Sequence, residues 1–178
     1  MPPAFVIHYS ACKDRDNLTA DLIHKTKATL VESCWLPADP VKGNLLSHIQ
    51  VAKLARTLHP TQHYLVFEDD CVLAEDWSEC LKGMEFSDVL YLGYNDKSKE
   101  VTYGTHALFI SPKARDAIIA RAEVLGHQVD RKNAFDHILS KLCRQEGLIT
   151  CMAKVEEKER YAHQQKGIKS YITGKVRH

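Results

Sequence analysis

Residues 63–70 read His63-Tyr64-Leu65-Val66-Phe67-Glu68-Asp69-Asp70, and this stretch decides both the fold class and the candidate site. Its apolar part predicts a short strand that is fully buried. Three adjacent carboxylates follow the strand directly. Because neighbouring carboxylates repel one another and are costly to desolvate, the stretch also predicts a compensating cation at the end of the strand.

A divalent metal is the predicted cation. Mn²⁺ and Mg²⁺ bind oxygen ligands and commonly bridge protein carboxylates to substrate phosphates. In an α/β sheet, ligands bind outside the carboxyl ends of the strands, which is where Glu68, Asp69 and Asp70 would lie. The triplet therefore predicts a phosphate-bearing ligand held through a metal. The alternative is an acidic loop that caps a helix beginning near Asp76.

The composition predicts one ordinary globular domain over residues 1–178. The chain is 44% hydrophobic and 26% charged, and its formal charge of +1 provides no field that would attract nucleic acid. Neither a membrane-spanning run nor a secretory signal is visible, so the expected location is cytoplasmic. The six cysteines lack the close pairing of zinc sites, which favours reduced thiols. A basic carboxyl-terminal tail from about residue 164 is a candidate for contact with a phosphate or a membrane surface, although water is its default partner.

Strand and helix patterns alternate along the chain. We expect strands over residues 4–9, 28–35, 63–67, 88–93, 103–110 and 148–153. Helices are expected over residues 14–27, 43–58, 77–82, 112–125 and 135–144. This alternation predicts an α/β fold, a three-layer α/β/α sandwich with a mostly parallel sheet.

Four segments occur in the order and rough spacing of glycosyltransferase family 25, which the chain resembles over nearly its whole length. They are Val6–Ser10 with Arg15 downstream, Gly43–His48, Leu65–Asp70 and Tyr103–Ser111. The family includes lipooligosaccharide and procollagen galactosyltransferases. The resemblance implies a nucleotide-binding fold of the GT-A type, a UDP-sugar donor, Mn²⁺ (or Mg²⁺), and transfer with inversion to a hydroxyl of a glycan, lipid-linked or protein acceptor. Galactose is the family's commonest donor sugar, and enzymes of lipopolysaccharide biosynthesis also suggest the inner membrane surface as a location.

The family pattern also assigns the acidic triplet. It implies that Glu68 and Asp70 flank the metal and the donor ribose, with Asp69 beside them. A metal between a carboxylate and both phosphates would neutralise the charge that builds on departing UDP, which agrees with this assignment. Asp70 is the first choice as ligand. His163 is a candidate to complete the metal shell, against the alternative of a surface histidine, and Lys166 or Lys169 would instead clamp the diphosphate.

Other donor-site residues come from the first strand and the long helix. Tyr9, Ser10 and Ala11 are expected against the uridine. Arg15 is expected to pair with a phosphate or to hold the loop, with an exposed helical arginine as the alternative.

Ser47 and His48 match a Ser-His pair of the family's donor site. The alternative is a buried polar pair that satisfies the neighbouring backbone.

Inversion needs a general base, and Asp136 at the start of a helix is the expected one. Helix capping is the alternative role for Asp136, and Asp130 is the reserve candidate.

Two rival functions remain open: a catalytically silent module that binds a nucleotide sugar or metal and acts through partners, and a nucleotidyltransferase or phosphotransferase that uses the same acids. The absence of the GxxxxGK[ST] pattern excludes a P-loop enzyme.

Overall fold

The structure is a computed structural model that describes residues 1–93, 96–97, 102–125, 134–153 and 162–164. Of residues 96–97, 102–103 and 163–164 it describes the backbone alone.

A six-stranded mixed sheet forms the centre of the molecule, in the order β2-β1-β3-β8-β5-β9. Its strands are β1 (Ala4–His8), β2 (Thr29–Glu32), β3 (Tyr64–Glu68), β5 (Val89–Tyr91), β8 (Ala107–Ile110) and β9 (Thr150–Met152). β8 runs antiparallel to both of its neighbours, and the other pairs are parallel. Two small sheets pair β4 (Cys71–Leu73) with β10 (Ala162–Gln164) and β6 (Asp96–Lys97) with β7 (Thr102–Tyr103).

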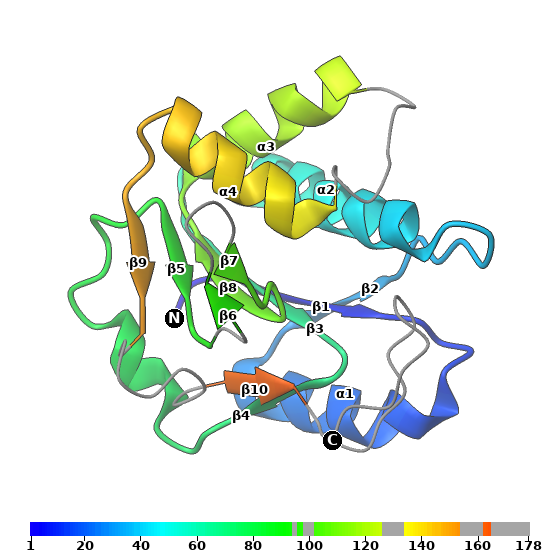
Figure 1. Cartoon of the computed structure of the whole chain (residues 1–178). Coiled ribbons are helices and arrows are strands. Elements are labelled where there is room, and N and C mark those ends of the chain that lie inside the picture. The colour runs from blue at the N-terminus through cyan, green and yellow to red at the C-terminus, as the bar shows by residue number, and fades with distance from the viewer. Residues whose placement is uncertain (94–95, 98–101, 126–133, 154–161, 165–178) are drawn as a thin grey trace.

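Helices cover both faces of the sheet and make the three predicted layers (Figure 1). They are η1 (Lys13–Arg15), α1 (Asp16–Thr26), α2 (Pro40–Leu58), η2 (Trp77–Leu81), α3 (Pro112–Leu125) and α4 (Phe135–Gln145), where η denotes a 3₁₀ helix. The helices α2, α3 and α4 lie on one face, and α1 lies on the other together with β4 and β10 (Figure 1). None of the helices within the described ranges has both the length and the apolar character needed to cross a membrane.

The alternation of side chains along β3 determines where the acidic triplet points. Tyr64 and Val66 pack into the core beneath α2, α3 and α4, whereas Leu65 and Phe67 pack into the core on the α1 side. Successive strand residues face opposite sides, so Glu68 follows Val66 toward α2. The residues after it turn toward α1.

The predicted fold class is confirmed, but of the strand predicted over residues 103–110 only the part from Ala107 to Ile110 forms as one strand. Thr102 and Tyr103 belong to the β6–β7 hairpin, and β8 begins only at Ala107. Gly104 has a φ of 109°, a backbone conformation that L side chains rarely adopt, so the chain turns here. The predicted helix over residues 77–82 is a 3₁₀ helix, and the β4–β10 pair had no counterpart in the sequence pattern.

Gly93, which follows β5, lies directly against the backbone of β10. A Cβ at this position would lie 1.8 Å from the carbonyl oxygen of Ala162 in β10. Only glycine permits this approach, which brings β10 beside β4 directly after the acidic triplet.

Candidate functional site

The carboxyl ends of β1, β2 and β3 meet at one edge of the sheet. β1 runs parallel to both neighbours, with His8 opposite Glu32 in β2 and Ile7 opposite Glu68 in β3. The loops that follow these strands therefore converge. This edge brings together the predicted donor residues 9–11 and the acidic triplet.

Arg15 supplies the cation that the acidic triplet requires on the α1 side. Its guanidinium pairs with Asp69 through Nη1 and lies 3.5 Å from Asp70 through Nη2. Arg15 is only 7% exposed, so the alternative of an exposed helical arginine is wrong. Burial alone would lower the pKa of Arg15, but the charges of Asp70 and Asp69 outweigh burial and raise it. Arg15 holds the loop, and a role in binding phosphate stays a prediction.

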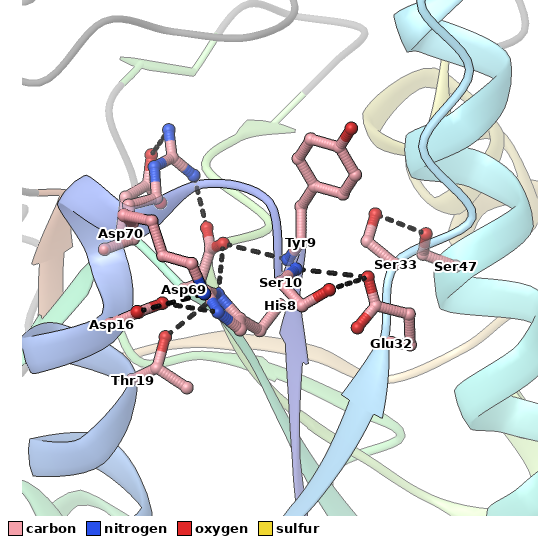
Figure 2. A network of polar contacts seen from close by, with 12 residues as sticks. His8, Tyr9, Ser10, Asp16, Thr19, Glu32, Ser33, Ser47, Asp69 and Asp70 are labelled. Atoms are coloured by element: carbon pink, nitrogen blue, oxygen red, sulfur yellow. Dashed lines mark hydrogen bonds and ion pairs between the residues drawn. The ribbon is translucent and has the colours of Figure 1, made fainter.

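His8, which the sequence analysis missed, joins this group from the last position of β1. Its Nδ1 lies 3.0 Å from Asp69 Oδ2, and its Nε2 lies 3.2 Å from Asp16 Oδ1. Thr19 Oγ1 also lies 3.2 Å from Nδ1, and the backbone N–H of Tyr9 donates to Asp69 at 3.3 Å. Figure 2 shows His8 and Tyr9 in contact with Asp69, and Asp16 and Thr19 in contact with His8. We call His8, Arg15, Asp69 and Asp70 the Arg15 cluster.

The loop after β1 is tied to the end of β2. Ser10 donates from both its backbone N–H and its hydroxyl to Glu32 Oε1, each at 3.1 Å (Figure 2). The ring of Tyr9 lies 5.6 Å from that of Trp35, centroid to centroid, and is tilted by 36°. Ala11 is exposed in the same loop. The contact of residues 9–11 with a nucleoside stays a prediction, and Trp35 is an aromatic residue that the sequence analysis left without a role.

Ser47 satisfies the backbone at the start of α2. It accepts from the N–H of Cys34 at 2.9 Å and donates to the carbonyl of Gly43 at 2.8 Å, and its hydroxyl lies 3.2 Å from that of Ser33 (Figure 2). This geometry supports the alternative reading of a buried polar residue that serves its neighbours. The donor-site role of Ser47 stays a prediction.

Glu68 faces α2, away from the Arg15 cluster. Its Oε1 accepts from His48 Nε2 at 3.2 Å, from Asn44 Nδ2 at 3.3 Å and from the Thr105 hydroxyl at 3.2 Å. Burial would raise the pKa of Glu68, but the hydrogen bond and charge of His48 outweigh it and lower the pKa to about 2. His48 is itself stacked on Phe135 of α4, with ring centroids 3.9 Å apart.

Asp136 completes this second group from the first turn of α4. Burial and the charge of Glu68 raise the pKa of Asp136 to about 7, against the opposing effect of hydrogen bonds from Thr105 and Gly104. Its Oδ1 is buried without a hydrogen-bond partner in the described part of the chain. The N-cap of α4 is Ala134, which offers no side-chain cap. We call Asn44, His48, Glu68, Thr105 and Asp136 the Glu68 cluster.

The structure tests the predicted metal site of Glu68, Asp70 and His163 only in part, because the side chain of His163 lies outside the described residues. Within the described ranges, no group of three or more His, Cys, Asp and Glu side chains could hold a metal. Glu68 faces α2 while Asp70 pairs with Arg15 near α1, so the two carboxylates do not converge. The backbone of His163 lies in β10 opposite Val72, and its side chain is outside the description. A divalent cation at Asp70 stays a prediction.

Three other predicted residues lie outside the described ranges. They are the reserve base Asp130 and the candidate phosphate clamps Lys166 and Lys169. Their roles stay predictions.

Solved structures with a similar fold include two glycosyltransferases. One is a glycosyltransferase involved in the glycosylation of the major capsid of PBCV-1, with a TM-score of 0.57 and 9% identity over 85% of this chain and 81% of that one. Apo GlyE from Streptococcus pneumoniae TIGR4 has a TM-score of 0.54 and 11% identity over 84% of this chain. The match spans only 45% of GlyE.

The chain has a glycosyltransferase-like fold. Identities this low show the fold alone, and the reaction must be argued from the site. No protein-family model matches the sequence, and no curated protein does either, so membership of family 25 stays a prediction.

Proposed function

We propose that this protein is a glycosyltransferase that transfers a hexose from a UDP-sugar to a hydroxyl of a glycan, lipid-linked or protein acceptor, with inversion at the sugar carbon. The observation that carries the proposal is Asp136. Its carboxylate has a pKa near neutrality and a buried oxygen without a donor in the described part of the chain, and it lies beside the strand end that carries the acidic triplet. A strongly shifted carboxyl group of this kind suits general acid–base chemistry.

The donor would bind across the carboxyl ends of β1 and β3. The rings of Tyr9 and Trp35 would contact the base, because they are paired aromatic side chains at the end of β1 and after β2. The Arg15 cluster would lie toward the diphosphate, with Asp70 holding a divalent cation. When bound, that cation would offset the negative charge that builds on the departing UDP.

Asp136 would act as the base on the acceptor side. Its carboxylate takes the proton of the acceptor hydroxyl while the acceptor oxygen forms a bond to the anomeric carbon. The bond between that carbon and the diphosphate oxygen breaks, and UDP leaves with the electron pair. The acceptor hydroxyl would supply a donor to Oδ1.

Thermal unfolding with a panel of nucleotide sugars tests the donor half of this proposal. UDP-galactose, UDP-glucose, UDP-N-acetylglucosamine and GDP-mannose are added with MnCl₂ or with EDTA. We expect at least one UDP-sugar to raise Tm when Mn²⁺ is present and to lose most of this effect in EDTA. If no nucleotide sugar changes Tm under either condition, the proposed donor is wrong.

Asp70→Asn tests the cation. This variant should lose the Mn²⁺-dependent rise in Tm, whereas Asp21→Asn, which changes a half-exposed carboxylate on α1, should keep it. A full response from Asp70→Asn would remove Asp70 as ligand.

A further inference from the structure

Thr105 lies between the two carboxylates of the Glu68 cluster. Its hydroxyl is 3.2 Å from Glu68 Oε1 and also hydrogen-bonds Asp136. The backbone N–H groups of Gly104 and Thr105 hydrogen-bond Asp136 as well. The turn that carries these groups exists because Gly104 has a φ of 109° and interrupts the strand pattern. Thr105 is buried, so water does not readily replace its hydroxyl.

A threonine hydroxyl has one proton, so it donates to one carboxylate at a time. Glu68 Oε1 already receives donors from His48 and Asn44, whereas Asp136 Oδ1 has none in the described part of the chain. Glu68 therefore remains satisfied when the hydroxyl turns to Asp136. In the described part of the chain, the turn at 104–105 supplies hydrogen-bond donors to Asp136.

We propose that Thr105 is the positioning residue of this site: its hydroxyl lies between Glu68 and Asp136 and donates to Asp136 when that carboxylate is ionised, which fixes the carboxylate for its work as base. The inference rests on the proposed function for that work, but the hydrogen bond itself is a property of the folded protein. Thr105 acts through Asp136, and its hydroxyl stabilises the ionised carboxylate.

Other ionisable groups surround this hydroxyl. His48 of α2 and His106 of the same turn interact with Glu68, and Tyr91 of β5 interacts with Asp136. These groups stay unchanged when only the hydroxyl of Thr105 is removed, so a matched set of Thr105 variants separates its effect from theirs.

The test is a ¹³C NMR titration of the full chain labelled at aspartate Cγ, with Asp136→Asn to assign the resonance. We expect wild-type Asp136 to titrate near pH 7. Thr105→Val keeps the shape and removes the hydroxyl, and it should raise the pKa of Asp136 by about one unit. Thr105→Ser keeps the hydroxyl and should restore the wild-type value. Thr105→Ala removes the hydroxyl with a smaller side chain and serves if the valine variant does not fold.

An unchanged or lowered pKa of Asp136 in the hydroxyl-free variants would overturn the inference. The titration does not require enzymatic turnover, so it tests the role of Thr105 separately from the proposed function. A second readout is the release of UDP from the UDP-sugar identified by thermal unfolding. Its rate at pH 6 should fall about tenfold in Thr105→Val relative to Thr105→Ser, because less of the base is ionised. If the pKa of Asp136 rises as expected but the protein has no turnover, the role of Thr105 is supported and the proposed transferase function is wrong.

Discussion

The two sides of β3 hold carboxylates under opposite electrostatic conditions. In the Arg15 cluster, a buried guanidinium pairs with Asp69 and Asp70, and His8 adds a further contact to Asp69. In the Glu68 cluster, three donors converge on one oxygen of Glu68 while an oxygen of Asp136 has no partner in the described part of the chain. A charged pair on the first side thus contrasts with two neighbouring acids on the second.

This contrast separates a structural role from a chemical one. Buried charges that are paired keep their ordinary ionisation and hold the loops together, whereas a buried carboxylate beside another acid takes up a proton near neutral pH. The paired charges stabilise the folded loops, whereas the carboxylate that titrates near neutral pH suits proton transfer. We therefore expect substitutions of Arg15 and its contacts with Asp69 to act mainly on stability, and substitutions in the Glu68 cluster to act mainly on pH dependence.

The largest effect on stability is expected from Arg15→Met. The substitution leaves Asp69 and Asp70 buried beside each other without their cation, and removing one partner of a buried pair costs about 3–5 kcal/mol. Urea unfolding at pH 7 measures the loss. Lys13→Met is the control, because the Lys13 side chain is 77% exposed and its pair with Asp16 should contribute under about 1 kcal/mol. Equal losses of unfolding free energy in Arg15→Met and Lys13→Met would contradict a structural role for the Arg15 cluster.

Asp136→Asn should make the protein less sensitive to pH. In wild type the pKa of Asp136 is raised from 3.8 to about 7, so the folded state keeps a proton that the unfolded state releases in this range. Wild-type stability therefore falls as pH rises from about 4 to 7, by up to about 4 kcal/mol from this group. The asparagine side chain of the variant carries no charge and escapes this loss. Urea unfolding of both proteins at pH 5 and pH 8 measures the difference, and a difference that does not grow with pH would contradict the assignment.

His48→Gln should weaken the protein in acid. Interactions with His48, together with those of His106 and Asn44, outweigh burial and lower the pKa of Glu68 from 4.5 to about 2, so they contribute stability above pH 4.5 that is lost as pH falls toward 2. Losing the hydrogen bond from His48 should cost about 1–3 kcal/mol at pH 5 and move acid unfolding to higher pH. Circular dichroism across an acid titration follows the midpoint. His24→Gln, at an exposed position of α1, should leave it in place.

Asp16→Asn should have the smallest effect. The Asp16 side chain is 46% exposed, and its contact with His8 lies at the rim of the Arg15 cluster. We expect a loss below about 1 kcal/mol in urea unfolding. A loss as large as that of Arg15→Met would contradict this prediction, because Asp16 would then stabilise the fold as strongly as the buried Arg15 does.

The sequence predicted the strands and helices because their hydrophobic periods were unambiguous. The buried run before Glu68 and the apolar face of residues 43–58 each admit one interpretation, and both elements formed as expected. The strand expected over 103–110 forms only from Ala107 to Ile110, because the backbone turns at Gly104. The pairing of β10 with β4 joins distant segments, which no local pattern reveals.

The site was harder to predict than the fold because its partners come from distant parts of the chain. The acidic triplet predicted a divalent metal, which stays a prediction, whereas the pairing of Asp69 with Arg15 depends on how the loop after β1 folds back onto β3. Asp136 was chosen from its place at a helix start, and its raised pKa follows from burial and from Glu68, which is remote in sequence. Thr105 and Asn44 stood within the quoted motifs without a role, since only the fold brings them to Glu68.

The most direct test of the account compares UDP release by wild type and Asp136→Asn at pH 8 with Mn²⁺ and the UDP-sugar that raises Tm. We predict that Asp136→Asn binds this donor with unchanged affinity in calorimetry while its turnover falls by about 10²–10⁴-fold. Wild-type turnover from Asp136→Asn would contradict the account, because the Glu68 cluster would then hold no base.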